Sequence, residues 1–373
     1  MKKILVSILA LCMILSTTSC GDYKELEQSS PILSMGIDKE GEDYKISVEL
    51  LNMNDYAGEI TVKPQTLSAT GKSIDEAIGS LRNVASEELY FSYLEVIILN
   101  EEIAKEGIDD IIDIILRNND FRLSINLLVT KGDAKEILNS KSNLQPVHGV
   151  EISNALKESE NNTSIVVITP INKIINTLFQ NGMEVCLPSV KVEKGENKEG
   201  YSFDEIAVFK GSKLAGYVNN KLSKYYSFAT DNAKKNTIII SNENFAAGGT
   251  VEKNKTDIEL KGKTLYINLD TSICMNEFNA KNTLSLDTNK VKKEFKEKIE
   301  KNIYNLITTV QKNYGVDIFG YGLKINKFNP NEFKPYEKNW NEHFKNLNIK
   351  VNANISLNND TDYKLAKGEN SNE

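Results

Sequence analysis

Two stretches decide the fold class, SMGIDKEGEDYKISVELLN (residues 34–52) and DEIAVFKGSKLAGYV (residues 204–218). In the first, a charged turn that contains glycine separates two apolar segments, and residues 44–51 alternate as a half-buried strand does. In the second, two apolar runs flank the turn KGSK at 210–213. Both patterns predict β-hairpins. They favour antiparallel pairing over the repeated βα units of a doubly wound fold.

Between these hairpins, apolar periodicity predicts alternating helices and strands. Ser73 and Glu76 form a capping box before apolar residues at helical spacing, so a helix is expected from about residue 74. Thr169 and Pro170 indicate an N-cap and first-turn proline of another helix, which Gly182 should end. The remaining predicted elements are a strand over 94–99, a short helix that ends at Gly107, a helix over 108–118, a strand over 123–129, a helix start at 133–138 and a strand over 184–192.

A charged, Gly-containing stretch at 193–200 without periodicity is the predicted domain boundary. It divides an N-terminal α+β region (31–195), with a candidate split into two lobes near residue 145, from a C-terminal α+β domain (202–358). The polar residues 359–373 are predicted to be a disordered tail. The predicted class is α+β, with mixed and antiparallel sheets and packed helices in several domains.

The C-terminal domain has one long predicted helix, from about Lys290 to Tyr314, with Gly315 as its stop. Its apolar stripe faces one way, and lysines and glutamates at ion-pair spacing occupy the other side. Packing on the domain's own sheet is the preferred interpretation, and a partner-binding helix is the alternative. The predicted strands are TIIIS (237–241), DIEL (257–260), TLYINLD (264–270) and LNIKVNANISL (347–357).

The first 22 residues, MKKILVSILALCMILSTTSCGD, predict where the chain works. Two lysines precede an apolar run that is too short to span a bilayer, which is typical of a secretory signal peptide (1–19). Cys20, after small residues and before Gly21, resembles the lipobox cysteine whose thiol is diacylglycerated. A lipidated tether (20–30) is therefore expected, since two acyl chains hold a protein stably on a membrane. The alternative is a signal peptide cut elsewhere that leaves a free thiol.

Composition argues against several function classes. The net charge of −7 becomes −9 once Lys2 and Lys3 are removed, which disfavours nucleic acid or anionic lipid as an electrostatic partner. Cys186 and Cys274 remain in the mature chain without zinc-site spacing. Cys186 is expected to be buried, and a 186–274 disulfide is the alternative.

Catalytic signatures are sparse. The chain has two histidines, His148 and His343, and no Walker or Rossmann phosphate-binding motif. The acids at 109, 110 and 113 suggest a solvated helix face, with a metal site as the alternative. A glycosidase that uses carboxylates alone stays open, but no pair of acids is singled out. We predict no enzyme, no cofactor and no metal.

Several segments, taken together and in order, resemble the C subunit of spore nutrient germinant receptors, the Ger(x)C family of lipoproteins. The similarity covers most of the mature chain, and the number and order of the segments make it specific. They are CGDY (20–23), GID (36–38), GKSIDEAI (71–78), VIILNEEIAKEGI (96–108), RNNDFR (117–122), CLPSV (186–190), AVFKGSKLAGY (207–217), VDIFGYGLKINKFNPNEFKPYEKNW (316–340) and the strand from Asn348.

The resemblance implies a three-domain α+β fold and a lipoprotein on the outer surface of the spore inner membrane. It further implies a multi-spanning A-type subunit and a permease-like B-type subunit as partners, and a receptor that responds to nutrients. Cys20 is the one site residue expected, for lipid attachment. A solute-binding lipoprotein of a membrane transporter is the alternative function, and a surface hydrolase is the third.

Overall fold

The computed structural model describes residues 29–56, 59–140, 147–163, 168–194, 199–280 and 287–358. The predicted signal peptide, Cys20 and the polar tail lie outside these residues, and so does the predicted split near residue 145. Of the predicted tether (20–30), Ser29 and Ser30 are described, and both belong to the first strand.

One nine-stranded mixed sheet runs through the N-terminal and middle parts of the chain. Its strands are β1 (Ser29–Glu40), β2 (Asp43–Tyr56), β3 (Glu59–Gly71), β4 (Glu88–Tyr90), β5 (Val96–Asn100), β6 (Asn126–Thr130), β7 (Cys186–Lys194), β8 (Glu199–Lys210) and β9 (Lys213–Val218). The order is β3-β2-β1-β5-β6-β7-β8-β9, with β4 paired to the start of β1. The pairs between β1, β5, β6 and β7 are parallel, and the outer pairs β1-β2, β2-β3, β7-β8 and β8-β9 are antiparallel.

Both predicted hairpins are confirmed. β1 pairs with β2 through Glu40 and Asp43, and β8 pairs with β9 through Lys210 and Lys213. Gly211 takes a φ of 60° in the second turn, a left-handed conformation that costs glycine little. A sheet with antiparallel flanks is the mixed α+β architecture that was predicted.

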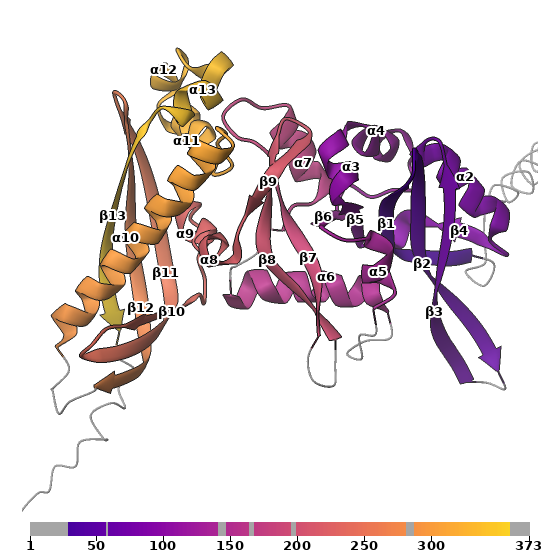
Figure 1. Ribbon diagram of the computed structural model, residues 1–373, viewed down its shortest axis with the longest axis horizontal. Helices are drawn as coiled ribbons and strands as arrows, with labels where there is room; N and C mark the ends of the chain where they lie inside the picture. The colour runs from indigo at the N-terminus through magenta and orange to yellow at the C-terminus, as the bar shows by residue number, and fades with distance from the viewer. Residues whose placement is uncertain are drawn as a thin grey trace, which may run out of the picture.

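The helices of this part cover the two faces of the sheet (Figure 1). They are α2 (Ile74–Val84), α3 (Glu101–Glu106), α4 (Asp109–Arg117), α5 (Ala134–Leu138), α6 (His148–Glu158) and α7 (Ile171–Leu178). The predicted N-cap of α2 is confirmed, because the Glu76 N–H donates to Ser73 Oγ at 3.1 Å. The Glu76 carboxylate accepts from the Lys72 N–H at 2.8 Å, one residue before the N–H that a capping box uses.

The ends of α7 differ from the prediction. Pro170, not Thr169, is its N-cap, and the helix ends at Leu178, well before Gly182. The hydroxyl of Thr169 instead donates to the carbonyl of Cys186 at 3.2 Å, which ties the segment before α7 to β7. Tertiary contacts have thus replaced the local capping that the sequence suggested.

The stretch 193–200 joins paired strands. Glu193 faces Gly200 and Lys194 faces Glu199 in an antiparallel ladder, so the sheet includes strands on both sides of the predicted domain boundary.

The C-terminal lobe is a four-stranded sheet with one long helix against it (Figure 1). Its elements are α8 (Asn220–Ser223), α9 (Tyr226–Ala229), β10 (Thr237–Ser241), β11 (Phe245–Lys261), β12 (Thr264–Ala280), α10 (Thr288–Asn313), α11 (Tyr321–Phe328), α12 (Pro330–Phe333), α13 (Trp340–Lys345) and β13 (Asn348–Asn358). The strand order is β10-β11-β12-β13, and β13 lies parallel to β12.

The long predicted helix is confirmed as α10. Its apolar stripe, from Val291 to Val310, is buried in the lobe's core, and Glu300 on its flank accepts the Ala353 N–H of β13 at 2.8 Å. Ion pairs lie on its outer side, such as Lys293–Glu297 at 3.7 Å. Burial of each large apolar side chain contributes about 1.5–3 kcal/mol, so packing on its own sheet accounts for this helix.

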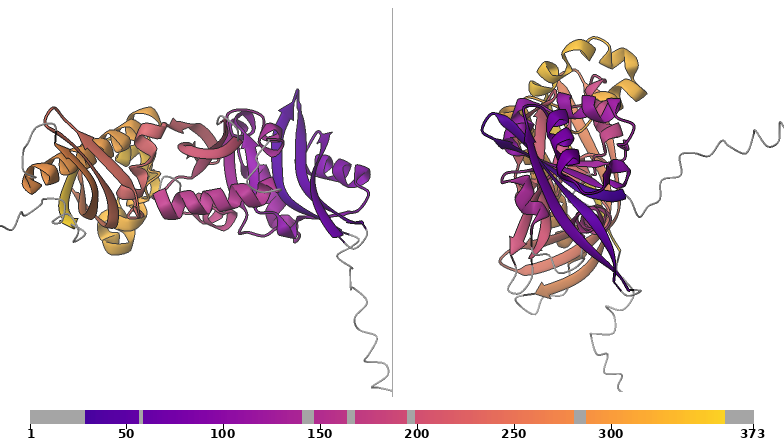
Figure 2. Two further views of the ribbon diagram at one scale, coloured as in Figure 1. Left: turned by 90° about the horizontal axis from the view of Figure 1, so that it is seen from below. Right: turned by 90° about the vertical axis from the view of Figure 1, so that its right-hand side faces the viewer.

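The molecule is elongated, with the four-stranded sheet at one end and β1 to β4 at the other (Figures 1 and 2). Strands β7 to β9 lie between these ends, and their side chains belong to three different hydrophobic cores. The C-terminal core takes Cys186, Ile206, Val208 and Val218; the N-terminal core takes Leu187, Ala207, Phe209 and Leu214; and a third core takes Val190 and Phe203. Strands β7 to β9 therefore join the lobes, because their apolar side chains belong to the cores on both sides.

Candidate functional site

A buried junction joins the middle strands to the C-terminal lobe, and Asp317 is its centre. The side chain of Asp317 is fully buried and accepts four hydrogen bonds. The donors are the N–H groups of Phe319 (2.9 Å), Gly320 (3.0 Å) and Gly322 (2.9 Å) and the indole Nε1 of Trp340 (2.8 Å). This carboxylate therefore fixes the loop before α11 and the start of α13 relative to each other.

Burial raises the pKa of the Asp317 carboxyl to about 6, above its ordinary value of 3.8. Loss of hydration disfavours the charged form, and the four donors oppose this effect only in part. Burying the charged carboxylate therefore costs free energy, which the surrounding hydrogen-bond donors offset in part.

Glu184 continues the junction toward the middle strands. Its N–H donates to the Asp317 carbonyl at 2.7 Å, and its carboxylate accepts from Asn341 Nδ2 at 2.6 Å and from the Gly211 N–H at 2.7 Å. The hairpin turn at Gly211 and Ser212 also contacts the N-terminal lobe, because the Ile108 N–H donates to the Ser212 carbonyl at 3.0 Å. The turn thus contacts the N-terminal lobe directly and is linked to the C-terminal lobe through Glu184.

Two glycines allow the backbones to approach at this junction. A Cβ on Gly322 would lie 2.6 Å from Gly182 Cα and 2.6 Å from Trp340 Nε1, so no side chain fits. The Leu323 N–H donates to the Gly182 carbonyl at 3.2 Å. Gly182, predicted as a helix stop, therefore serves this contact between lobes.

A further buried acid, Asp38, holds helix α5 on the N-terminal sheet. Asp38 accepts the N–H groups of Ala134 (2.6 Å) and Lys135 (2.9 Å) at the start of α5, and burial raises its pKa. Gly36 lets this helix approach, since a Cβ there would lie 3.0 Å from the Ala134 side chain. The GID segment is therefore accounted for by packing and capping.

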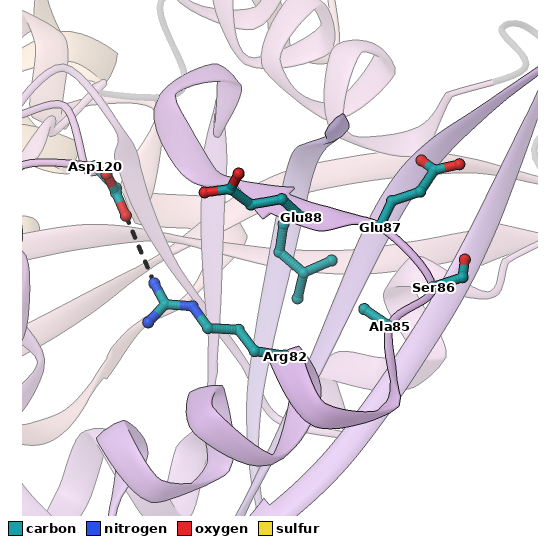
Figure 3. A pocket seen from close by; sticks show the side chains of 7 residues that line it. Arg82, Ala85, Ser86, Glu87, Glu88 and Asp120 are labelled. Atoms are coloured by element: carbon teal, nitrogen blue, oxygen red, sulfur yellow. Dashed lines mark ion pairs between the residues drawn. The ribbon is translucent and has the colours of Figure 1, made fainter. Parts of the chain in front are cut away.

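The N-terminal lobe carries a hollow of about 830 Å³ that is open to solvent. We call it the N-terminal hollow, and it is lined by Arg82, Ala85, Ser86, Glu87, Glu88, Leu89 and Asp120. In Figure 3 the Glu87 and Glu88 carboxylates stand on one side, and Arg82 reaches across to Asp120, 3.5 Å away. The Ser30 hydroxyl donates to Glu87 at 2.6 Å, so the hollow adjoins the start of β1.

The titratable residues considered from sequence do not assemble into a catalytic centre. His148 contacts the Tyr201 hydroxyl through Nδ1 at 2.8 Å, whereas His343 stacks on Tyr336 in the other lobe. Cys186 is buried, as predicted, and both it and Cys274 are free thiols, so the alternative of a 186–274 disulfide is wrong. In the described ranges, no group of three or more His, Cys, Asp or Glu side chains is placed to hold a metal ion.

Sequence reasoning missed the roles of Asp317, Glu184 and Gly322, although two of them lie in segments quoted for the family resemblance. The available signal is an acid followed by Ile-Phe-Gly-Tyr-Gly (residues 317–322), because an Asp side chain often accepts hydrogen bonds from backbone N–H groups a few residues on in glycine-containing turns. The partner Trp340 is 23 residues away, and no local pattern connects it to the acid.

Two protein-family models match consecutive parts of this chain. The family model described as "Spore germination protein N-terminal domain" matches residues 22–192, and the model described as "Spore germination B3/ GerAC like, C-terminal" matches residues 204–360. Together they span most of the chain, with the parts in the expected order. The chain belongs to the Ger(x)C family of spore germination proteins, the C subunits of germinant receptors.

Relatives that match most of the chain are also spore germination proteins. The putative spore germination protein YfkR of Bacillus subtilis is 22% identical over 372 residues, covering 94% of this chain and 95% of that protein. Spore germination protein KC of the same organism is 23% identical, with 94% of each chain covered. Spore germination protein GerQC of Bacillus cereus is 24% identical, with 81% of this chain and 84% of the relative covered.

A solved structure supports the fold. The crystal structure of the GerBC protein superposes with a TM-score of 0.56 at 17% identity, covering 87% of this chain and 96% of that one. The α+β class is confirmed, and family membership supports a role in spore germination. None of the helices described is long and apolar enough to cross a membrane.

Proposed function

We propose that this chain is a lipid-anchored, non-enzymatic subunit of a nutrient germinant receptor, needed for assembly or signalling of the complex that triggers germination. The observation that carries the proposal is the pair of family models that covers residues 22–192 and 204–360 in order. The partners would be a multi-spanning A-type and a permease-like B-type subunit. The complex would lie at the spore inner membrane, with this chain on its outer face.

Cys20 is the proposed attachment point. The N-terminal family model begins at residue 22, directly after the lipobox-like stretch, so the anchor would precede the folded body by a short tether. Diacylation supplies two buried chains at roughly 0.8 kcal/mol per methylene, which is enough for stable anchoring.

The buried carboxylates support a scaffolding role over catalysis. The oxygens of Asp317 and Asp38 accept backbone or indole N–H groups that hold loops and helices, so these acids are engaged in the fold. The mixed sheet also lacks the two lobes of repeated βα units that a solute-binding lipoprotein needs, and that alternative is not favoured.

Co-expression with the A-type and B-type subunits tests the proposal. Mild detergent extraction followed by capture of this chain should recover both subunits. Recovery of neither, under conditions that keep other receptor complexes intact, would contradict the proposal.

The anchor is tested separately by Cys20→Ala, which should abolish incorporation of labelled palmitate and release the chain from membranes when it is expressed without partners. Cys274→Ala is the matched control, and it should leave labelling and membrane association unchanged. A Cys20→Ala chain that is still labelled would place the lipid elsewhere.

A further inference from the structure

Residues 82–123 hold an unusual surface composition. All three arginines of this lysine-rich chain lie there, at 82, 117 and 122. Of the nine exposed large apolar side chains in the described ranges, five also lie there: Val84 (61% exposed), Tyr90 (39%), Tyr93 (42%), Leu116 (50%) and Leu123 (42%). Tyrosine and arginine are enriched and lysine is depleted in the buried centres of protein interfaces.

Tyr90, Tyr93 and Arg122 of this surface form one contacting group. The rings of Tyr90 and Tyr93 lie 5.7 Å apart, and the Arg122 guanidinium lies 5.9 Å from the Tyr93 ring centre. The Ser92 hydroxyl donates to the Asp120 carbonyl at 3.1 Å, which holds this turn against the loop that carries Arg122. The aromatic side chains are therefore presented in a fixed geometry before any partner arrives, which lowers the entropic cost of binding.

The N-terminal hollow adjoins Tyr90 along the chain, since Tyr90 directly follows the lining residues Glu88 and Leu89 in β4. We call the hollow and the exposed side chains around it the tyrosine–arginine surface. Its lining carries three carboxylates against the one guanidinium of Arg82. Ten acidic and four basic residues occur between positions 82 and 123, so this segment carries a net negative charge.

The surface is also close to the proposed anchor. Ser29 opens β1 and pairs with Glu88 beside the hollow. Nine residue steps separate Cys20 from Ser29, and an extended chain covers at most about 3.3–3.6 Å per residue. If Cys20 carries the lipid, the surface lies within about 30 Å of the bilayer, inside the reach of segments that membrane-embedded proteins expose.

We infer that the tyrosine–arginine surface docks a positively charged, apolar extracytoplasmic segment of a membrane-embedded protein partner. The inference rests on the proposed function and adds the surface and the chemistry of the contact. A lysine or arginine of the partner enters the hollow beside Glu87 and Glu88, and its apolar neighbours pack on Tyr90 and Tyr93. The net negative charge disfavours both an anionic lipid surface and a second copy of the same face, because each would oppose like charges.

The test uses the full-length, lipidated chain co-expressed with the A-type and B-type subunits. Tyr90→Ser/Tyr93→Ser removes the exposed rings, and Glu88→Lys reverses one charge at the hollow. Each should lower recovery of a subunit at least about tenfold, the loss typical of interface hot spots. Phe179→Ser/Phe328→Ser is the matched control, since it removes two even more exposed rings (81% and 73%) elsewhere and should leave recovery unchanged.

The outcomes separate the alternatives. Wild-type recovery by both surface variants, with circular dichroism confirming their fold, overturns the inference and leaves the proposed function standing. A wild-type chain that recovers neither subunit overturns both. Loss of binding to phosphatidylglycerol vesicles without partners would assign the surface to lipid, and a change of sedimentation mass would assign it to a second copy; either result overturns the inference.

Discussion

Asp317 shows how one buried carboxylate organises a contact between lobes. Each of its oxygens accepts two N–H donors, one pair from Phe319 and Gly320 and the other from Gly322 and Trp340. An ionised carboxylate is an acceptor only, with about four lone-pair sites on its two oxygens, so it can accept all four of these hydrogen bonds. The geometry requires the ionised form, whereas burial favours the neutral one, and this conflict makes the residue sensitive to pH.

Asp317→Asn places an amide NH₂ against two of these donors, and we expect the free energy of unfolding at pH 7 to fall by about 1–3 kcal/mol. Because the folded pKa of about 6 lies above the ordinary value of 3.8, the folded wild type binds this proton more tightly than the unfolded chain does. The group therefore adds stability as the pH falls through about 6 toward 4, by at most about 3 kcal/mol. The gap between wild type and variant should widen from pH 7.5 to pH 5, as measured by urea unfolding, and a constant gap would contradict the assignment.

Gly322→Ala tests the close approach of the two backbones. The new Cβ would lie 2.6 Å from Gly182 Cα, so the lobes must shift, and a loss of about 1–3 kcal/mol or more is expected. Gly79→Ala is the control, because nothing lies within 4 Å of its Cβ position inside α2. The control should be neutral or stabilising by up to about 1 kcal/mol. Thermal unfolding of both variants distinguishes the close approach from a general effect of added methyl groups.

At the scale of elements, local patterns predicted most helices and strands because their periodicity coincides with the burial that packing requires. α10 is the clearest case, since Val291, Phe295 and Ile299 repeat at the spacing of one helix face and all are buried. The ends of α7 were mispredicted because long-range contacts of Thr169 and Gly182 determine that segment. The ion pairs along α10 follow from the spacing of its lysines and glutamates, whereas the junction hydrogen bonds could not be predicted, since they join residues far apart in sequence.

Helix α6 depends on a carboxylate from another element. Glu49 of β2 is buried and accepts the N–H groups of His148 and Gly149, each at 2.7 Å. Its second oxygen also accepts the Ser34 hydroxyl at 2.9 Å. The helix therefore has a cap that its own sequence does not supply, and the acid needs all of these donors because it has lost its hydration.

Glu49→Gln should destabilise the protein by about 1–3 kcal/mol and raise amide exchange over residues 148–158, because an NH₂ would face backbone donors. Glu40→Gln is the matched control, an exposed acid 2.9 Å from Lys45, where a change below about 1 kcal/mol is expected. Hydrogen exchange followed by mass spectrometry measures both effects. Unchanged exchange in α6 of the Glu49 variant would show that the cap is dispensable.

At the scale of the whole molecule, the family models part between residues 192 and 204, while the sheet and the cores run across that position. β8 explains this difference, because Phe203, Val208 and Phe209 enter three different cores. Alternation along one strand directs neighbouring side chains to opposite faces, so a single strand can serve two lobes. Composition marks a charged stretch at 193–200 but carries no information on which sheet the strand after it will join.

Because strands β7 to β9 contribute to all three cores, we predict that the two lobes unfold cooperatively. Trp340 is the sole tryptophan of the chain and lies in the C-terminal core, so its fluorescence reports that lobe. Leu99→Ala empties a fully buried site in the N-terminal core and should cost about 2–5 kcal/mol. If β7 to β9 couple the cores, the Trp340 transition in urea should move to lower denaturant together with the circular dichroism transition. Val84→Ala, at an exposed site of the same lobe, should move neither. If the Trp340 transition of the Leu99→Ala chain stays at the wild-type midpoint, the lobes unfold independently. Strands β7 to β9 would then only contact the neighbouring lobe and would not couple its stability to that of the other.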